Sequence, residues 1–253
     1  MPVAIITGAS KGLGRALAAA LAGRGWDLVV DARSAGPLEE AADRLRAAGA
    51  RVVALPGDVV DGRHRAALVA AARGLGGLDL LVNNASVLGA EPLVRLADQP
   101  LDGLRAALEV NVVAPLGLVQ EALPLLRAPS ESSPHRESSP YIGAEGAIGA
   151  YGAVLSISSD AAVAAYGTWG GYGATKAALD QQSAVLAVEE PELRVWWVDP
   201  GDMRTDLYAA AIPVEDDSGR PLPESVVPAL LRLLDGSAPS GRYVAAELLD
   251  GIR

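Results

Sequence analysis

The chain has 253 residues, and its 21 Lys and Arg against 31 Asp and Glu give a formal charge of −10. Half of the residues are apolar and only 21% are charged, which excludes a disordered chain and predicts a large domain with a sizeable core. The acidic balance offers no electrostatic basis for binding nucleic acid or anionic lipid, and the absence of cysteine excludes disulfides, thiolate nucleophiles and cysteine-ligated metals.

The remaining metal-ligand and targeting signals are weak. His64 and His135 are the only histidines, and neither has a histidine partner one helical turn away, so we expect no metal site. A strand-like run at Val3–Ile6 leaves no room for a secretory signal, and the least charged stretch, Ala161–Thr175, is shorter than the roughly 18 residues that a membrane span needs. We therefore expect a cytoplasmic protein that binds a small-molecule substrate, with no nucleic-acid or membrane partner.

Short β-branched runs alternate with longer Ala- and Leu-rich runs of helical period along the chain. Such alternation predicts an α/β fold, because parallel strands need crossover connections and helices supply them. We expect one doubly wound, Rossmann-like domain over residues 1–253, with a mostly parallel seven-stranded sheet and helices on both faces. The expected strands are Val3–Ile6, Leu28–Ala32, Val52–Leu55, Leu80–Val82, Val154–Ile157, Arg194–Val198 and Tyr243–Ala245; the expected helices are Leu13–Arg24, Pro37–Ala48, Gly62–Gly74, Leu101–Leu126, Tyr172–Val188 and Glu224–Leu234.

A glycine-rich loop follows the first strand and runs directly into a helix. Its sequence is Thr7-Gly8-Ala9-Ser10-Lys11-Gly12-Leu13-Gly14. Glycine lets the backbone turn sharply and approach a phosphate, and the helix N-terminus behind it offers free N–H groups and a partial positive charge. The pattern predicts a dinucleotide pyrophosphate site, although an ordinary tight turn would have a similar sequence.

The end of the second strand indicates which nicotinamide cofactor is bound. An acidic side chain there binds a ribose 2′-hydroxyl, and a basic one receives a 2′-phosphate. Ala32 occupies the expected position of the acid, Arg33 follows it, and Lys11 adds a second cation in the neighbouring loop. The charges favour NADP(H) over NAD(H); the alternative is that Asp31 reaches the ribose and Arg33 is solvated.

The segment from about 128 to 151 interrupts the alternation of strands and helices. It is rich in Ser and Pro and then in Gly and Ala, which predicts a long exposed loop inserted in the domain. A tolerated surface insertion explains it, and so does a functional lid or partner-binding segment.

The second chemical motif joins a serine to a tyrosine and a lysine. Ser159 stands at the end of a predicted strand, where ligands collect in open α/β sheets. Tyr172 and Lys176 are four residues apart, hence one turn apart on the same helix face. A nearby ammonium lowers the pKa of a phenol toward the range useful for acid–base catalysis. The chain has only two lysines, Lys11 and Lys176, and each lies in one of the two motifs.

Together these motifs resemble the short-chain dehydrogenase/reductase family. The resemblance spans residues 3 to about 205 and includes Asp58-Val59, Asn83-Asn84-Ala85, Asn111 and Pro200-Gly201-x-x-x-Thr205. It implies a catalytic set of Asn111, Ser159, Tyr172 and Lys176, in which Tyr172 is the general acid–base, Lys176 binds the nicotinamide ribose, Ser159 polarises the carbonyl and Asn111 supports a water beside Lys176. It further implies that the cofactor contacts Thr7, Gly8, Ser10, Lys11, Gly12, Leu13, Gly14, Arg33, Asp58, Val59, Asn83, Ala85, Tyr172, Lys176, Pro200, Gly201 and Thr205.

From this resemblance we expect a metal-independent NADP(H)-dependent ketone or aldehyde reductase, or alcohol dehydrogenase. A cofactor-binding sensor without redox turnover, and related chemistry on the same fold, stay open as alternatives. Ser86 departs from the usual glycine of the family, and the acidic stretch 206–224 predicts little apolar wall for a substrate. Trp169, Tyr166 and Tyr208 line the substrate cleft or merely pack. The resemblance also suggests a homodimer or homotetramer through the helices Leu101–Leu126 and Tyr172–Val188. For Asn111, the simpler alternative to a catalytic role is an amide that only bonds neighbouring backbone.

Overall fold

The computed structural model describes residues 1–128 and 151–250. The predicted insertion at 128–151 therefore lies almost wholly outside the described residues, and its role stays a prediction.

Seven parallel strands form a single sheet in the order β3-β2-β1-β4-β5-β6-β7. Every neighbouring pair is parallel, so the predicted fold class is confirmed. The order reverses between β1 and β4, which creates a crevice at the carboxyl ends of these strands. The strands are β1 (Val3–Ile6), β2 (Asp27–Ala32), β3 (Val52–Pro56), β4 (Leu80–Asn83), β5 (Ala153–Ile157), β6 (Arg194–Asp199) and β7 (Gly241–Val244).

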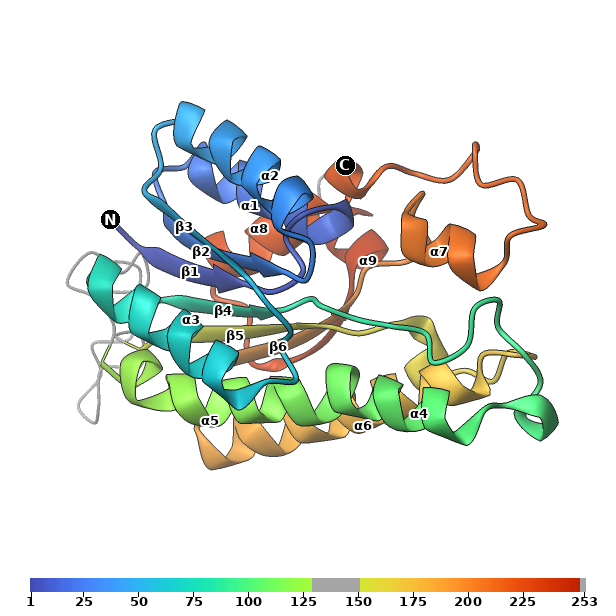
Figure 1. The fold of residues 1–253 in the computed structure, drawn as a ribbon. Helices are drawn as coiled ribbons and strands as arrows, with labels where there is room; N and C mark the ends of the chain where they lie inside the picture. Colours follow the sequence, from blue (N-terminus) through green and yellow to red (C-terminus); the bar gives the residue numbers. More distant parts are fainter. Residues whose placement is uncertain (129–150, 251–253) are drawn as a thin grey trace.

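Helices cover both faces of the sheet, as Figure 1 shows. One apolar cluster joins α1 (Gly12–Ala22), α2 (Ala35–Ala47) and α8 (Val227–Asp235) to one face, and a second joins α3 (Gly62–Leu75), α5 (Ala114–Leu126) and α6 (Gly170–Glu189) to the other. The central strands β1 and β4 are buried along their whole length, because a parallel sheet covered on both faces leaves little strand surface in water.

The structure corrects three details of the predicted elements. Residues 101–126 form α4 (Leu101–Leu108), a π-helical turn (Glu109–Val113) and α5 instead of one regular helix. The last strand ends at Val244, and Ala245 begins α9 (Ala245–Asp250). The stretch after β6 contains a helix that the sequence analysis missed, α7 (Asp206–Ala211), in which the Thr205 hydroxyl accepts a hydrogen bond from the Tyr208 N–H.

Among the described residues one helical run, Leu101–Leu126, is long and apolar enough to cross a membrane by length and composition. In the fold, 44% of its most apolar window is buried, and it packs against α3 and α6. A core helix has the same composition, so the run adds no support for a membrane-spanning role.

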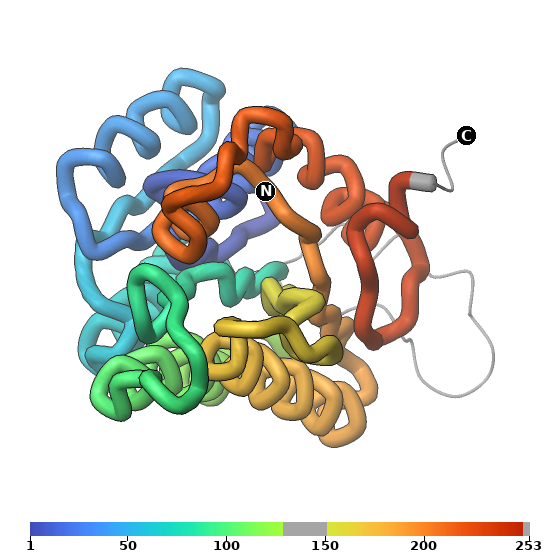
Figure 2. The backbone as a smooth tube through the Cα atoms, turned by 90° about the vertical axis from the view of Figure 1, so that its right-hand side faces the viewer, coloured from blue at the N-terminus to red at the C-terminus, as the bar shows by residue number. Residues whose placement is uncertain are grey.

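Figure 2 looks onto the edge at which the strands end. The segments that follow β4, β5 and β6 gather there, although they are far apart in the sequence. This edge therefore brings together the two motifs that the sequence analysis singled out.

Candidate active site

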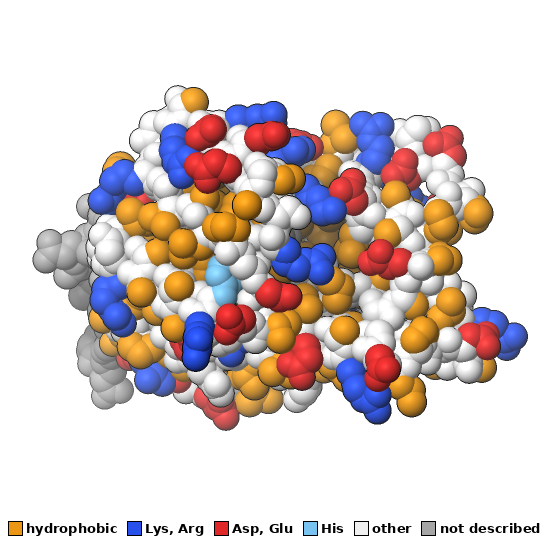
Figure 3. Space-filling model, in the orientation of Figure 1, with side chains coloured by type: hydrophobic (Ala, Val, Ile, Leu, Met, Phe, Trp, Pro, Cys, Tyr) orange, Lys and Arg blue, Asp and Glu red, His pale blue; other side chains and the backbone are white. Residues whose placement is uncertain are grey.

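A cleft of about 1050 Å³ opens at this edge of the sheet. It is larger than the ~300–1000 Å³ that is usual for a pocket holding one small molecule. In Figure 3 the surface is hollowed near the middle of the view, and acidic and basic side chains meet at its margin. The predicted site residues that line the cleft are Gly8, Ser10, Lys11, Gly12, Leu13, Arg33, Asp58, Val59, Ala85, Ser159, Tyr172, Lys176, Pro200, Gly201 and Thr205.

The glycine loop has a backbone shape that side chains other than glycine would strain. Gly8 and Gly12 have φ angles of +66° and +56°, in the left-handed region that glycine adopts without cost. A Cβ on Gly14 would lie 2.5 Å from Asn84 Nδ2 and 2.6 Å from the Gly8 carbonyl oxygen. A Cβ on Gly12 would have Thr205 Cγ2, at 3.7 Å, as its nearest protein atom. A side chain at this position would therefore extend into the open cleft.

Three predicted contacts, Thr7, Gly14 and Asn83, are not on the cleft surface. The buried Thr7 hydroxyl accepts hydrogen bonds from the N–H groups of Asn84 and Ala85, at 2.9 and 3.0 Å. The Asn84 side chain donates to the carbonyls of Thr7 and Gly8. Thr7 and Asn84 therefore hold the glycine loop against the end of β4, and Thr7 helps to shape the cleft without lining it.

The N-terminus of α1 faces the cleft with its charge uncompensated. Its first turn has no acidic residue, and the N-cap residue Lys11 makes no side-chain cap. The free N–H groups and the helix dipole therefore present a partial positive charge. A pyrophosphate fits this end of the cleft, because Gly12 leaves space beside the helix terminus.

Asp31 is engaged inside the fold. Its Oδ1 accepts the Gly8 N–H at 2.8 Å, and its Oδ2 lies 3.0 Å from His64 Nε2. Both oxygens therefore have partners on the glycine loop and on α3. Asp31 and Arg33 both line the cleft, but Asp31 is almost fully buried. Arg33 has no partner among the hydrogen bonds and ion pairs of the described residues.

Lys11 has an ion-pair partner that the sequence could not indicate. Its Nζ lies 2.8 Å from Asp206 Oδ2 at the start of α7, and both side chains are mostly exposed. The pair connects the two rims of the cleft. A smaller hollow beside it is lined by Arg15 and Arg44, two further cations near Lys11 that the sequence analysis missed, although Arg15 stands one helical turn after Lys11.

Tyr172 and Lys176 lie side by side in the first half of α6, both almost fully buried. The Lys176 Nζ is 5.5 Å from the centre of the Tyr172 ring and donates to the Ile157 carbonyl at 2.8 Å. Burial raises the pKa of Tyr172 to about 12 and lowers the pKa of Lys176 to about 8, against the opposing effect of Asp180. The expected lowering of the tyrosine pKa is therefore wrong here, because burial dominates and the ammonium points to a carbonyl.

Ser86 and Asp160 also act on Tyr172. The Ser86 side chain lowers the Tyr172 pKa in part, whereas the negative charge of Asp160 raises it. The Ser86 hydroxyl is buried and makes no hydrogen bond of ordinary geometry with any described residue, although it lines the cleft. Sequence reasoning noted Ser86 only as a departure from a family pattern, and it did not single out Asp160.

The Ser159 hydroxyl points into a turn that follows β5. Its Oγ donates to Asp160 Oδ1 at 3.1 Å and accepts the Ala161 N–H at 3.1 Å. Its only proton is thus directed to a carboxylate, and the hydroxyl must rotate before it can donate to a substrate oxygen.

Asn111 lies in the π-helical turn and is buried away from the cleft surface. Its side chain accepts the Val87 N–H at 2.9 Å and donates to the Val87 carbonyl at 2.8 Å and to Thr175 Oγ1 at 2.9 Å. Thr175 Oγ1 in turn donates to the Tyr172 carbonyl. Asn111 therefore ties the segment after β4 to the turn of α6 that carries Tyr172, which matches the simpler alternative of an amide that bonds backbone.

The wall beyond Tyr172 is aromatic and apolar. Trp169 packs edge to face on Tyr172 with ring centres 5.7 Å apart, and Tyr208 lies 6.4 Å from Trp169. Both line the cleft, whereas Tyr166 does not and is exposed. Leu207, from α7, packs beside Tyr172. The expectation of little apolar wall after Thr205 is therefore wrong, because the missed helix α7 supplies one.

In the part of the chain that the structure describes, no group of three His, Cys, Asp or Glu could hold a metal ion.

Comparison with known proteins identifies relatives of the whole fold. The short chain dehydrogenase family model matches residues 2–133 and 142–215. An uncharacterized oxidoreductase of Saccharomyces cerevisiae is 30% identical over 208 residues, which cover 81% of this chain and 72% of that protein. An uncharacterized oxidoreductase of Mycobacterium tuberculosis is 30% identical and covers 98% and 89%. Other curated relatives are longer, and the chain spans 15% and 34% of two of them.

A solved structure agrees in fold over nearly the full chain. The alcohol dehydrogenase from the archaeon Thermococcus sibiricus, complexed with 5-hydroxy-NADP, is 25% identical. It superposes with a TM-score of 0.79 over 96% of this chain and 95% of its own.

Proposed function

The chain belongs to the short-chain dehydrogenase/reductase family, and we propose that it is an NADP(H)-dependent oxidoreductase acting on a carbonyl or secondary alcohol. The observation that carries the proposal is the burial of Tyr172 beside Lys176 in the same cleft as the uncapped helix terminus of the glycine loop. A phenol and an ammonium so placed form a proton-transfer site next to a dinucleotide site.

The site residues fit a nicotinamide dinucleotide. The open space over Gly12, with the free N–H groups of α1 behind it, suits a pyrophosphate. When bound, NADPH supplies the hydride for the carbonyl carbon. The Tyr172 hydroxyl donates its proton to the carbonyl oxygen, which gives the secondary alcohol, and solvent later restores that proton.

The protonation states suit reduction at neutral pH. With a pKa of about 12, the Tyr172 phenol keeps its proton at pH 7 and can donate it. With a pKa of about 8, Lys176 is mostly charged, and its ammonium can stabilise the phenolate that donation leaves behind once it turns from the Ile157 carbonyl toward Tyr172. Ser159 hydrogen-bonds the carbonyl oxygen once its hydroxyl turns away from Asp160.

NADP(H) is proposed over NAD(H) because of the partners at the end of β2. Both oxygens of Asp31 already have partners and the residue is almost fully buried, so it offers less to a ribose 2′-hydroxyl than an exposed carboxylate would. Arg33 lines the cleft and can pair with a 2′-phosphate, and Lys11 can do so if it leaves Asp206.

The test of the reaction is Tyr172→Phe, assayed with a panel of ketones and aldehydes by NADPH absorbance. We expect turnover to fall at least a thousandfold while NADPH affinity, measured by calorimetry, stays within about threefold. Full activity of the variant would refute the mechanism. Binding of NADPH with no turnover of any substrate by the wild-type protein would instead favour a cofactor-binding sensor.

The test of cofactor choice is Arg33→Ala. We expect KM for NADPH to rise at least tenfold, about 1.4 kcal/mol, with little change for NADH. Equal effects on the two cofactors would remove the NADP(H) assignment.

We also propose a homodimer or homotetramer through α5 and α6. Val113, the last residue of the π-helical turn, and Leu116 in the first turn of α5 are apolar and exposed, and so are Val185 and Val188 near the end of α6. Burial of such side chains favours association, and light scattering of the purified protein would detect a monomer if the proposal is wrong.

A further inference from the structure

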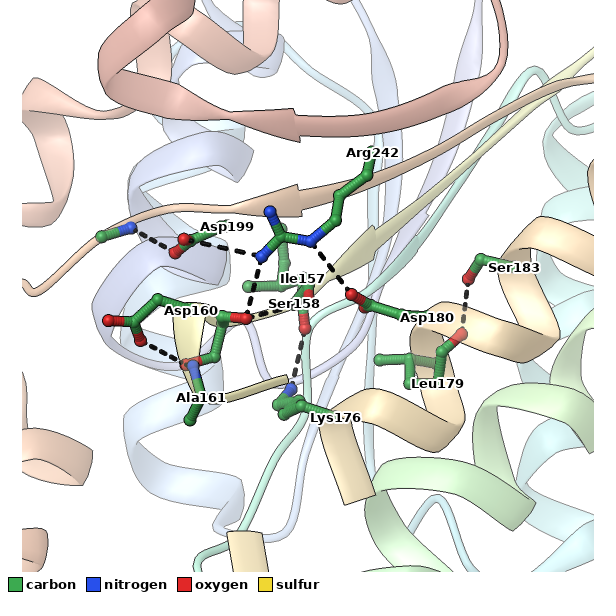
Figure 4. Close-up of polar contacts among 12 residues, drawn as sticks. Ile157, Ser158, Asp160, Ala161, Lys176, Leu179, Asp180, Ser183, Asp199 and Arg242 are labelled. Atoms are coloured by element: carbon green, nitrogen blue, oxygen red, sulfur yellow. Dashed lines mark hydrogen bonds and ion pairs between the residues drawn. The ribbon is translucent and has the colours of Figure 1, made fainter. Parts of the chain in front are cut away.

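One side chain of the last strand joins three segments beneath the cleft. Figure 4 shows Arg242 of β7 reaching toward β5, β6 and α6. Its guanidinium donates to Asp180 Oδ2 at 3.1 Å and to the Ser159 carbonyl at 3.0 Å, and it lies 3.7 Å from Asp199 Oδ2. Arg242, which does not line the cleft, thus fixes the backbone of Ser159, which does.

Asp199 extends the network to the loop after β6. Its Oδ1 accepts the Gly201 N–H at 2.9 Å, which fixes the turn at Pro200-Gly201 on the cleft surface. Arg242 therefore bears on both Ser159 and this turn at once.

Asp180 links the network to Lys176. The two residues are four apart on α6 and share one face of the helix. Lys176 is buried and makes no ion pair within 4 Å among the described residues; its Nζ donates only to the neutral Ile157 carbonyl. The charge of Asp180 therefore acts on the ammonium through space, in a poorly solvated interior where screening is weak.

The other charges around Lys176 come from several elements. Tyr172 is its aromatic neighbour on α6. On the elements packed against α6, the charged groups at the cleft end are Asp160 after β5, Asp199 in β6 and Arg242 in β7, while Arg194 lies at the opposite end of β6 and bonds the Gly236 carbonyl. Asp102 and Arg105 of α4 and Glu109 of the π-helical turn are exposed.

We propose that the Asp180–Arg242 ion pair is a positioning couple, which sets the charge of Lys176 and holds Ser159 in place for the reaction. Arg242 neutralises part of the Asp180 charge and so limits the support that Asp180 gives to the ammonium. The consequence for catalysis rests on the proposed function, whereas the effect on Lys176 can be measured without any reaction.

If the pair sets the charge of Lys176, its two members should shift the Lys176 titration in opposite directions when each is replaced, which a purely structural ion pair would not do. In Asp180→Asn, the supporting negative charge is lost, and Lys176 gives up its proton at lower pH. In Arg242→Gln, Asp180 is no longer neutralised and a positive charge is lost, so Lys176 keeps its proton to higher pH. The two variants break the same contact, yet we expect opposite shifts of about one pH unit each.

The lysine content makes the measurement direct. Because the chain has only two lysines, protein labelled with ¹³C-lysine gives two sets of side-chain signals, and Lys11→Arg leaves Lys176 alone. The midpoint of its Cε shift against pH reports the charge of Lys176 in each variant. Opposite shifts support the proposal; shifts in one direction, or none, overturn it.

The matched control is Arg51→Gln. Arg51 pairs with the buried Asp27 at the opposite end of the sheet, so the Arg51→Gln variant loses an Arg–carboxylate ion pair that is remote from the cleft. Its Lys176 midpoint should equal that of the wild type. If Arg242→Gln does not fold, Arg242→Lys replaces it, because lysine keeps the positive charge. The Lys176 titration midpoint of Arg242→Lys should then lie within about 0.3 pH units of the wild type, while that of Asp180→Asn is still lower. A large shift in Arg242→Lys would contradict the charge argument.

Activity supplies the second readout. We expect Arg242→Gln to lower kcat for ketone reduction at least tenfold, with KM for NADPH within about twofold, and Arg242→Lys to recover part of the loss. An unchanged kcat overturns the positioning role of Arg242. If no ketone is reduced by the wild type, the proposed function fails, but the lysine titration still decides the inference about Lys176.

Discussion

Changing Gly12 or Gly14 of the glycine loop to alanine should impair the protein for different reasons: the first change should weaken cofactor binding, and the second should lower stability. Gly12→Ala adds a Cβ that meets no protein atom closer than 3.7 Å, but at a φ of +56°. A residue with a Cβ in this left-handed region costs about 1 kcal/mol. Gly14→Ala places a Cβ 2.5 Å from Asn84 Nδ2 and 2.6 Å from the Gly8 carbonyl oxygen, so the neighbouring backbone must move.

The cost of Gly14→Ala follows from the contacts that it disturbs. Overpacking costs about 1–3 kcal/mol, and weakening the two hydrogen bonds from Asn84 to the loop costs about 1 kcal/mol each. Better helix propensity returns up to about 1 kcal/mol. The net loss is about 3 kcal/mol, against about 1 kcal/mol for Gly12→Ala. At roughly 3 °C per kcal/mol for a chain of this size, the apoprotein Tm should fall by about 9 °C and about 3 °C respectively.

Cofactor binding should separate the two variants. The Cβ of Gly12→Ala occupies the space assigned to the pyrophosphate, so Kd for NADPH should rise at least tenfold, about 1.4 kcal/mol, in a protein that is nearly as stable as the wild type. Scanning calorimetry and titration calorimetry measure the two quantities. If Gly12→Ala binds NADPH normally, the assignment of this cleft wall to a pyrophosphate is refuted. If Gly12→Ala loses as much stability as Gly14→Ala, the packing argument for the two glycines is refuted.

Two further predictions concern charges at the cleft. Asp160→Asn keeps an acceptor for the Ser159 hydroxyl but removes a charge that raises the Tyr172 pKa. Loss of this charge should lower the pKa of Tyr172 by roughly half a unit or more. The ultraviolet absorbance of the phenolate, taken as the difference between Asp160→Asn and the same variant with Tyr172→Phe, measures that pKa; a pKa equal to that of the wild type would contradict the effect of Asp160. The exposed Lys11–Asp206 pair should add less than about 1 kcal/mol to stability. In steady-state assays, however, Lys11→Gln should raise KM for NADPH and Asp206→Asn should lower it, because the Asp206 carboxylate competes with the cofactor phosphate for the Lys11 ammonium. A change of KM in the same direction in both variants would rule out that competition.

Local sequence patterns predicted most of the fold and the outline of the site. The strands and the main helices follow from β-branched runs and helical periodicity, whose causes lie within a few residues. The strand-to-helix turn at Gly8–Gly14 and the four-residue spacing of Tyr172 and Lys176 are equally local. Elements without such a pattern were missed or misplaced: α7 is only six residues long, and the π-helical turn at Glu109–Val113 interrupts a run whose composition is uniformly helical.

The tertiary structure decided the partners and the protonation of these groups. Arg242 reaches Ser159 across 83 positions of sequence, and Lys11 reaches Asp206 across 195, so neither contact has a signature in sequence spacing. The sequence alone predicted that Lys176 would lower the pKa of Tyr172, but burial of the phenol outweighs a charge that points elsewhere. The sequence by itself thus determined which chemical groups the site contains. Desolvation and distance set the pKa values and the partners of those groups, and both arise only once the sheet has brought the strand ends together.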